Sequence, residues 1–292
     1  MSEIILKQPV FMCAGEPSGD MYAGLLINRL KKKISELKVY GVGGSEMHRH
    51  GVEIVIDYNN LMAFGFSSGI ASFFKNYKMY QKIAQKLYEI KPKTFIAVAY
   101  TGMNLLLCQY AKKVGCVVHY FLPPQIWAWG EFRKFFIKKW VDTVISVFPF
   151  EYAFYRQTGI QTVYFENPLF DELKKFKRSD VSKRIGFMPG SRQSEITRNL
   201  PIMIEMMRRV AQERIDVEFY LILYPESSQR LYGSVPYAKV VTKNRYQAMK
   251  NCDLLITSSG TASLEAAIME IPQVFVNRPS FFDWYVSKKF LK

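Results

Sequence analysis

The chain has 292 residues, 49% of them hydrophobic, which is enough for one large domain or two domains of ordinary size. Its 40 Lys and Arg exceed its 25 Asp and Glu by 15, and the resulting positive field favours anionic partners: nucleic acid, acidic lipid surfaces or phosphorylated substrates. Four cysteines without a CxxC pair and only three histidines exclude a zinc ribbon and argue against a histidine-based metal site, so we predict no metal, no cofactor and reduced, buried cysteines.

The amino terminus has no basic region followed by a long apolar stretch, and no run of about 18 apolar residues occurs in the chain. We therefore expect neither a signal peptide nor a membrane-spanning helix. The remaining expectation is a cytoplasmic protein that touches a membrane surface.

Short apolar runs rich in β-branched and aromatic residues alternate with longer stretches of helical spacing. Helical spacing is clearest over Met21–Leu37, Tyr77–Ile90 and Leu200–Arg214. Because the apolar runs lack strict alternation, they indicate strands buried on both faces, and their alternation with helices predicts parallel α/β sheets. Strands are predicted over residues 9–15, 38–44, 52–56, 94–100, 116–122, 142–148, 161–165, 184–190, 217–224, 238–242, 253–257 and 272–276.

The alternation begins again near residue 184, after the polar and basic segment 167–183, which we interpret as a linker. We therefore predict an α/β protein with two tandem Rossmann-like domains, residues 1–170 and 171–292, facing each other across a cleft. Ligands of such sheets bind beyond the carboxyl ends of the strands, so the site is expected in that cleft.

A small-residue loop, CAGEPSGD, follows the first predicted strand. Gly15 allows a tight turn, and Ser18 or Asp20 is suited to capping the next helix. Glu16 has no capping role in this interpretation, so it is a candidate base or acceptor of a substrate hydroxyl. A simple strand–turn–helix connection is the alternative.

A second loop, MPGSRQSEITRNLP, follows the first strand of the second predicted domain. Gly190 and Ser191 supply amides and a hydroxyl at a helix start, and Arg192 adds a positive fork. This combination suits a phosphate or diphosphate, although the Gly-Lys-Ser/Thr ending of a Walker A loop is missing. The alternative is a capping turn with an exposed Arg.

A third loop, in TSSGTASLEAA (257–267), also joins a strand to a helix. Ser258, Ser259, Gly260 and Thr261 offer hydroxyls and amides at the positive end of the helix dipole. Glu265, about one turn further, is placed to accept hydrogen bonds from a ribose diol. A capping box explains part of this pattern, but two phosphate-type loops in one domain favour a nucleotide sugar held without a metal.

Six motifs occur together in this chain: AGEPSGD (14–20), LMAFGF (61–66), LPPQIWAW (122–129), FPFE (148–151), MPGSRQSEI (188–196) and SGTASLEAA (259–267). In this order and at this spacing, they resemble the lipid A disaccharide synthase family, glycosyltransferases of the two-Rossmann GT-B architecture. The resemblance spans nearly the whole chain.

The resemblance implies a metal-independent, inverting transfer of diacylglucosamine from UDP-2,3-diacylglucosamine to lipid X, giving lipid A disaccharide phosphate and UDP. It implies acceptor contacts in the first domain, with Glu16 as our candidate base. It also implies the inner membrane of a Gram-negative bacterium, and a homodimer is a further expectation. The acceptor-side residues are Ser18, Asp20, Asn104 and Trp127, and the UDP-binding residues are Gly190, Ser191, Arg192, Glu195, Ser259, Gly260, Thr261 and Glu265.

The chain departs from the family pattern after the fourth predicted strand. Members carry a segment resembling DxPDFN, whereas this chain has AYTGMN (99–104), so Ala99 and Gly102 replace aspartates. An Asp there is the usual candidate for the base, and Asn167 stands where members tend to have His. The alternatives are an inactive homologue that binds a UDP-sugar or lipid, and another GT-B enzyme, such as a nucleotide-sugar epimerase or a transferase with a different acceptor.

Aromatic and basic residues are mixed in WAWGEFRKFFIKKW (127–140), and residues 64–80 have a similar composition. On a helix, Phe132, Phe135, Phe136 and Trp140 form an apolar face beside cations, which is typical of a segment in a membrane interface. We expect these side chains to face an anionic membrane; a core-packing helix with a solvated basic face is the alternative. No basic arm, zinc knuckle or RRM-like pattern supports nucleic-acid binding, so none is expected.

Overall fold

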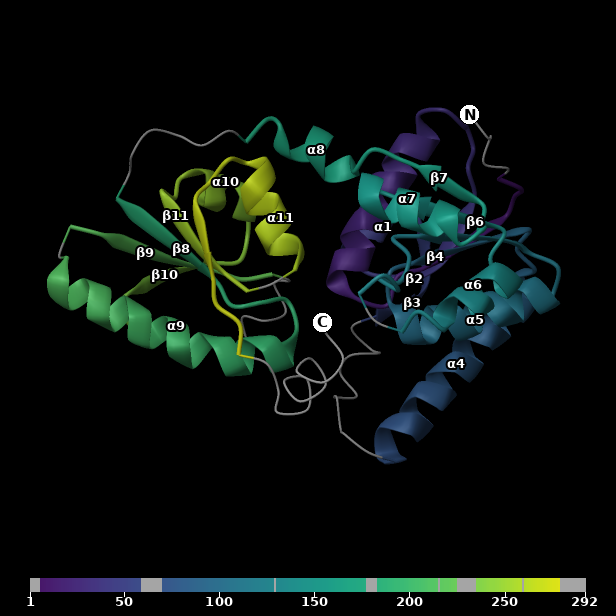
Figure 1. The fold of residues 1–292 in the computed structure, drawn as a ribbon, viewed down its shortest axis with the longest axis horizontal. Coiled ribbons are helices and arrows are strands. Elements are labelled where there is room, and N and C mark those ends of the chain that lie inside the picture. The colour runs from purple at the N-terminus through teal and green to yellow at the C-terminus, as the bar shows by residue number, and fades with distance from the viewer. Residues whose placement is uncertain are drawn as a thin grey trace. The chain divides into compact units, whose positions relative to one another are not determined.

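The structure, a computed structural model, describes residues 6–58, 70–128, 130–176, 183–214, 216–224, 235–258 and 260–278. The chain forms two compact units, Met1–Pro168 and Leu169–Lys292, and each is built around one parallel β-sheet (Figure 1). The prediction of two tandem Rossmann-like α/β domains is confirmed, and every run predicted as a strand contains one.

The first sheet has the strand order β3-β2-β1-β4-β5-β6-β7, with all neighbours parallel. Every residue of β1, β4 and β6 is buried, which explains why their sequences lack alternation. The strands are β1 (Val10–Cys13), β2 (Val39–Gly43), β3 (Glu53–Asp57), β4 (Thr94–Val98), β5 (Val117–Phe121), β6 (Thr143–Ser146) and β7 (Thr162–Tyr164).

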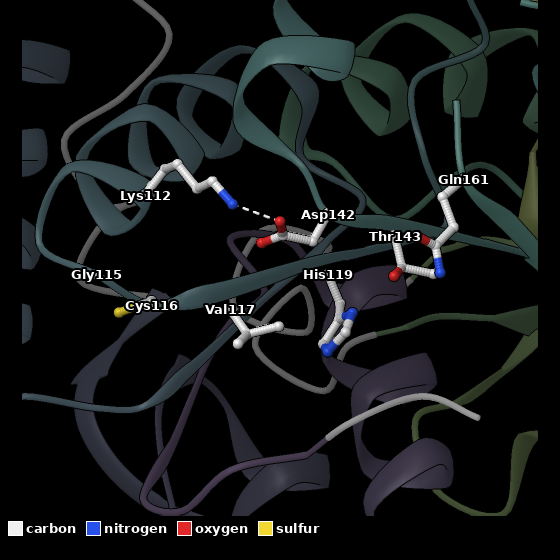
Figure 2. A pocket seen from close by; sticks show the side chains of 8 residues that line it. All are labelled: Lys112, Gly115, Cys116, Val117, His119, Asp142, Thr143 and Gln161. Atoms are coloured by element: carbon white, nitrogen blue, oxygen red, sulfur yellow. Dashed lines mark hydrogen bonds and ion pairs between the residues drawn. The ribbon is translucent and has the colours of Figure 1, made fainter. Parts of the chain in front are cut away.

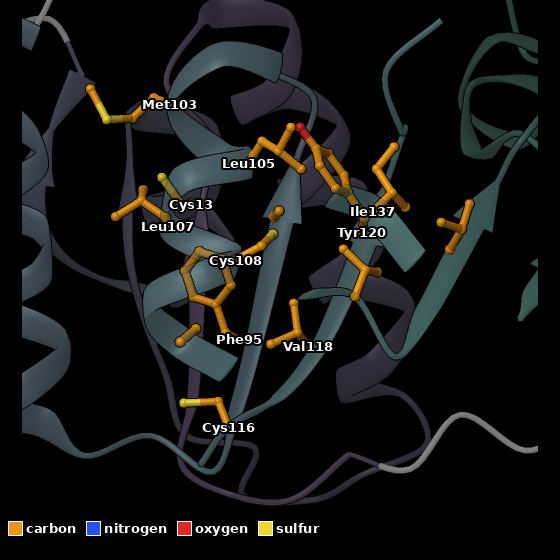
Figure 3. Close-up of a cluster of buried hydrophobic side chains, with 14 of the residues drawn as sticks. Cys13, Phe95, Met103, Leu105, Leu107, Cys108, Cys116, Val118, Tyr120 and Ile137 are labelled. Carbon is orange, nitrogen blue, oxygen red and sulfur yellow. The ribbon is translucent and has the colours of Figure 1, made fainter. Parts of the chain in front are cut away.

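One core covers this sheet on the side where α4, α5 and α6 pack, α4 against α5 and α5 against α6 (Figure 1). Figure 3 shows Leu107 and Cys108 of α5 beside Phe95 of β4 and Val118 of β5. The helices of this domain are α1 (Pro17–Lys31), α2 (Ser45–Arg49), α4 (Ile70–Ile90), α5 (Thr101–Lys113), α6 (Arg133–Trp140) and α7 (Pro149–Gln157).

The second sheet has the order β10-β9-β8-β11-β12, again all parallel. Its core joins Phe187 and Leu221 of the sheet to Met203 and Met207 of α9. The elements are α8 (Pro168–Leu173), β8 (Arg184–Met188), α9 (Gln193–Glu213), β9 (Glu218–Ile222), β10 (Ala238–Val241), α10 (Arg245–Lys250), β11 (Leu254–Thr257), α11 (Thr261–Ile268) and β12 (Gln273–Phe275).

In both sheets the chain winds outwards in two directions from the first strand. The direction reverses between β1 and β4 in the first sheet, and between β8 and β11 in the second. Ligands of open α/β sheets bind at the carboxyl ends of the two strands that flank such a reversal. The three small-residue loops of the sequence follow β1, β8 and β11, so each lies at one of these two positions.

Candidate active site

Glu16 ends the loop after β1 and occupies the N-cap position of α1, with Pro17 as the first helical residue. Its side chain makes no capping hydrogen bond, as the sequence predicts. Instead, the Ser18 hydroxyl donates to Glu16 Oε1 at 3.3 Å. Gly15 serves close packing, because a Cβ there would lie 2.4 Å from two carbons of the Tyr100 ring. A half-buried carboxylate with a hydroxyl donor thus lies at the reversal of the first sheet.

Asp20 is fully buried, and its carboxylate accepts three backbone N–H groups at the start of α2. The donors are Gly44 at 2.7 Å, Glu46 at 3.0 Å and Met47 at 3.1 Å. Burial raises the pKa of Asp20, against the effect of these three donors. The structure therefore gives Asp20 a role that the sequence did not predict: it holds α2 onto α1 by satisfying amides that the helix itself leaves unpaired.

Asn104 connects the ends of β1 and β4. Its amide nitrogen lies 3.1 Å from the Cys13 carbonyl, 3.1 Å from the Val98 carbonyl and 2.9 Å from the Ala99 carbonyl, and the side chain is completely buried. The Tyr120 hydroxyl also donates to the Ala99 carbonyl, at 2.9 Å. Asn104 therefore shapes the backbone at the reversal of the first sheet.

Trp127 follows β5 and is 43% exposed, with its indole N–H donating to Glu151 Oε1 at 3.3 Å. Glu151 lies in the first turn of α7, is buried, and also accepts the Ser146 hydroxyl at 3.3 Å. Burial raises the pKa of Glu151, and the two donors oppose that shift. The motif FPFE contains Glu151, but the sequence predicted no role for this residue. The signal that could have identified it was an acidic residue two positions after a Pro that starts a helix.

In the second domain, Glu195 shapes the loop after β8. Its Oε2 accepts the backbone N–H of Ser191 at 3.2 Å and of Arg192 at 3.3 Å, while Oε1 accepts Arg192 Nη1 at 3.1 Å. Gly190 has φ +130°, and a Cβ there would lie 2.7 Å from Glu195 Oε2. One of the two amides predicted to meet a phosphate, that of Ser191, is thus bonded to Glu195, while the Arg192 side chain stays 44% exposed.

The loop after β11 approaches the end of β8, since the Ser258 N–H donates to the Met188 carbonyl at 2.9 Å. Gly260, with φ +132°, is the N-cap of α11, and no side chain of the described residues caps that helix. Its first amides, from Thr261 onward, are the kind that bind a phosphate. Ser259, also predicted for UDP binding, lies outside the described residues.

Glu265 is completely buried in an ion pair with Arg245. Oε1 accepts Arg245 Nη2 at 2.6 Å and the Tyr246 hydroxyl at 3.0 Å, and Oε2 accepts Arg245 Nη1 at 3.0 Å. The guanidinium lies 4.2 Å from the ring centre of Tyr224 and 4.4 Å from that of Tyr246. The carboxylate predicted to meet a ribose therefore already anchors α11 to α10, and no spacing rule would have paired residues 20 positions apart.

Comparisons with known proteins bear on this arrangement. The model of the lipid-A-disaccharide synthetase family (LpxB) matches residues 10–292. The chain belongs to this family. Lipid-A-disaccharide synthase from Nitrosococcus oceani is 33% identical over 97% of this chain and 77% of its own length. Lipid-A-disaccharide synthase 2 from Legionella pneumophila is 32% identical over 92% of this chain and 75% of its own length.

Two solved structures share the fold of this family member at low identity. A structure of S. aureus MnaA with UDP has a TM-score of 0.64 at 13% identity, covering 92% of this chain and 79% of that one. UDP-GlcNAc 2-epimerase from Neisseria meningitidis, bound to UDP-GlcNAc, has a TM-score of 0.62 at 12% identity, covering 91% and 81%. At such identities the likeness shows the fold alone, and that fold is the predicted GT-B type.

In this lipid-A-disaccharide synthetase family member, Phe132, Phe135 and Phe136 are 60%, 67% and 40% exposed. Trp140 instead packs against the core of the first domain and stacks on Phe136 with ring centres 5.0 Å apart. Three of the four predicted membrane-facing side chains are therefore at the surface of α6, beside Arg133 and Lys134. In the described part of the chain, no helix is long and apolar enough to cross a membrane.

A cavity of about 430 Å³ lies at the other end of the strands of the first sheet, where β5, β6 and β7 begin (Figure 2). An ion pair between Lys112 and Asp142 crosses it, and Asp142 Oδ2 also accepts the Val118 N–H at 2.9 Å. The ion pair and this hydrogen bond satisfy the two charged groups within the domain. The lining residues are Lys112, Gly115, Cys116, Val117, His119, Asp142, Thr143 and Gln161.

All four cysteines are free and buried, including the three that lie in apolar runs and were predicted to be so. Within the described ranges, no group of three or more His, Cys, Asp and Glu side chains is arranged to hold a metal ion.

Proposed function

We propose that this protein transfers diacylglucosamine from UDP-2,3-diacylglucosamine to lipid X, releasing UDP and inverting the anomeric configuration. Membership of the lipid-A-disaccharide synthetase family supports the reaction class. The observation that carries the proposal is the position of the loops: the candidate phosphate loops lie on both sides of the reversal between β8 and β11.

For the donor, we propose that the diphosphate of UDP binds between the Gly190–Arg192 loop and the start of α11. Among the described residues no side chain caps the first amides of α11, and the helix dipole favours an anion at that end. Arg192, half-exposed, would contribute the charged hydrogen bonds that stabilise departing UDP. Ser191, Ser259, Gly260 and Thr261 complete the proposed UDP site, while Glu195 acts by holding the loop and Glu265 by anchoring α11.

For the acceptor, we propose that Glu16 removes the proton of the attacking hydroxyl. The acceptor oxygen bonds to the anomeric carbon, the bond from that carbon to the diphosphate oxygen breaks, and UDP leaves with the electron pair. Ser18 is within hydrogen-bond distance of Glu16 and would fix the direction of the carboxylate. Asn104 and Trp127 contribute to the acceptor side, Asn104 by shaping the backbone and Trp127 through its exposed ring.

The aromatic face of α6 supports a site at a membrane surface, where acylated substrates are found. We propose that Phe132, Phe135 and Phe136 enter the interface of an anionic membrane, on the cytoplasmic side of the inner membrane. A homodimer and the absence of nucleic-acid partners belong to the same proposal. In the second aromatic and basic segment, 64–80, residues 64–69 lie outside the described residues.

The replacement of family aspartates by Ala99 and Gly102 favours a second candidate, a homologue that binds a UDP-sugar or lipid without turnover. Both candidates predict UDP binding, and only the first predicts disaccharide. A transfer assay in detergent micelles, with purified protein, UDP-2,3-diacylglucosamine and lipid X, separates them. Product supports the transferase; UDP binding by calorimetry without product supports the second candidate.

Glu16→Gln tests the assignment of the base. The amide keeps the size of the side chain and its bond with Ser18 but cannot take a proton, so turnover should fall by about 100-fold or more. UDP affinity, measured by calorimetry, should stay near that of the wild type because UDP is assigned to the other domain. Glu131→Gln, an exposed carboxylate before α6, is the matched control. Unchanged turnover in Glu16→Gln would remove Glu16 from the mechanism.

A further inference from the structure

Tyr100 lies at the reversal of the first sheet in a backbone conformation that non-glycine residues rarely adopt. Its φ is +48° and its ψ +56°, and the preceding Ala99 also has φ +48°. Each left-handed residue of this kind costs about 1 kcal/mol or more, so the surrounding contacts must maintain it. Asn104 and Tyr120 do so by bonding to the Ala99 carbonyl, at 2.9 Å each.

The ring of Tyr100 packs directly on the loop that carries Glu16. A Cβ on Gly15 would lie 2.4 Å from two ring carbons and 2.8 Å from a third, so only a glycine permits this approach. Burial raises the pKa of Tyr100, and the nearness of Cys13 and Glu16 adds to the shift. The phenol therefore keeps its proton at neutral pH and can serve as a hydrogen-bond donor, not as a base.

The Tyr100 hydroxyl makes no hydrogen bond within the part of the chain that the structure describes. No residue of the described ranges accepts its proton, and it is not among the polar atoms sealed from solvent. The two fully buried tyrosines of this core behave differently, since Tyr120 donates to the Ala99 carbonyl and Tyr155 to the Pro124 carbonyl. Tyr100 is thus a strained residue, held in place by its neighbours beside Glu16, and its hydroxyl is available to a ligand. Strain of this kind is concentrated at functional sites, so the combination points to a bound ligand.

We propose that Tyr100 contacts the acceptor: its hydroxyl donates a hydrogen bond to an oxygen of the acceptor sugar and so presents the attacking hydroxyl to Glu16. This inference rests on the proposed transfer to an acylated sugar. Tyr100 neither gains nor loses a proton in the reaction. The proton of the attacking hydroxyl goes to Glu16, while Tyr100 fixes the orientation in which that hydroxyl approaches the anomeric carbon.

Tyr100→Phe tests the hydroxyl alone, because the phenylalanine ring keeps the packing against Gly15. We expect kcat/KM for lipid X to fall by about tenfold, the effect of losing one hydrogen bond, with the KM for the UDP-sugar and the Tm unchanged. Tyr110→Phe is the matched control: Tyr110 lies on the same helix, α5, and packs edge-on against Tyr80 with ring centres 6.4 Å apart. It should behave as the wild type. A kcat/KM for Tyr100→Phe within twofold of the wild type overturns the proposal, since a packing role alone predicts that result.

Failure of the transfer reaction itself would be recognised separately. If the wild type forms no disaccharide, the proposed activity is wrong, and Tyr100 is then tested by calorimetric binding of lipid X in micelles. Several-fold weaker binding to Tyr100→Phe than to the wild type and Tyr110→Phe supports the acceptor contact. Equal affinities, or no binding of lipid X to the wild type, overturn it.

Discussion

At the residue scale, Glu151 shows how burial couples a candidate site to pH. Its carboxyl is buried, and its pKa is raised above the ordinary value of 4.5. A group that holds its proton more tightly in the folded protein stabilises the fold below its unfolded pKa, and this contribution is lost as pH rises through the folded pKa. From about pH 4 to about pH 8, the free energy of unfolding of the wild type should therefore fall relative to that of Glu151→Gln.

Urea unfolding of both proteins across this pH range measures the difference. The amide of the variant does not titrate and still accepts the indole N–H of Trp127, so the comparison isolates the carboxyl. Glu213→Gln, at the exposed end of α9, is the control for a carboxyl that is not buried. A stability difference that stays constant with pH would contradict the buried, titrating carboxyl.

At the element scale, α2 is a helix of five residues whose start depends on a side chain from α1. Asp20→Ala removes the acceptor of three backbone N–H groups, two of them in buried hydrogen bonds and one in a partly buried one. Each buried donor left without an acceptor costs about 1–3 kcal/mol. We expect the free energy of unfolding to fall by about 3 kcal/mol, measured in urea. Glu131→Ala, which loses only an exposed ion pair, should change it by less than about 0.5 kcal/mol. Equal stabilities would show that α2 does not need this cap.

At the scale of the whole molecule, the net charge of +15 and the exposed phenylalanines of α6 predict binding to anionic membranes. Replacing Phe132 and Phe135 together by Ser should weaken binding to phosphatidylglycerol-containing vesicles by about tenfold or more. The reason is that each substitution removes a ring that would be buried in the apolar part of the membrane interface. Co-sedimentation measures the effect. Phe275→Ser, at an equally exposed position of β12, should bind as the wild type does.

Salt provides a second test of the same surface. The basic residues beside the aromatic face attract anionic lipid through solvent, so raising the ionic strength should weaken binding of the wild type and of the control. Binding that depends neither on salt nor on the two phenylalanines would place the membrane contact elsewhere on the chain.

The sequence by itself determined the fold class, the positions of the strands and the three small-residue loops that follow β1, β8 and β11. It did so because buried parallel strands need continuous apolar runs, and because tight strand-to-helix connections need small residues. Its helix boundaries were less accurate: α4 begins at Ile70 instead of Tyr77, and α9 at Gln193 instead of Leu200. The first turn of α9 is mostly polar, which explains the late start predicted there. For α4 the spacing of Ile70, Phe73 and Phe74 already continues the helical pattern, and the prediction overlooked it. The motifs also identified the family, because their order and spacing are specific only in combination.

Only the tertiary structure decided what the polar side chains of those loops do. Asp20 caps α2, Glu265 pairs with Arg245, and Glu151 holds the indole of Trp127, and each partner is distant in the sequence. The strained Tyr100 against Gly15 likewise depends on two strands that meet only in the folded sheet. Hydrophobic periodicity is a local property that a sequence displays directly, whereas the partner of a buried carboxylate is chosen by packing, which brings together residues that no local pattern connects.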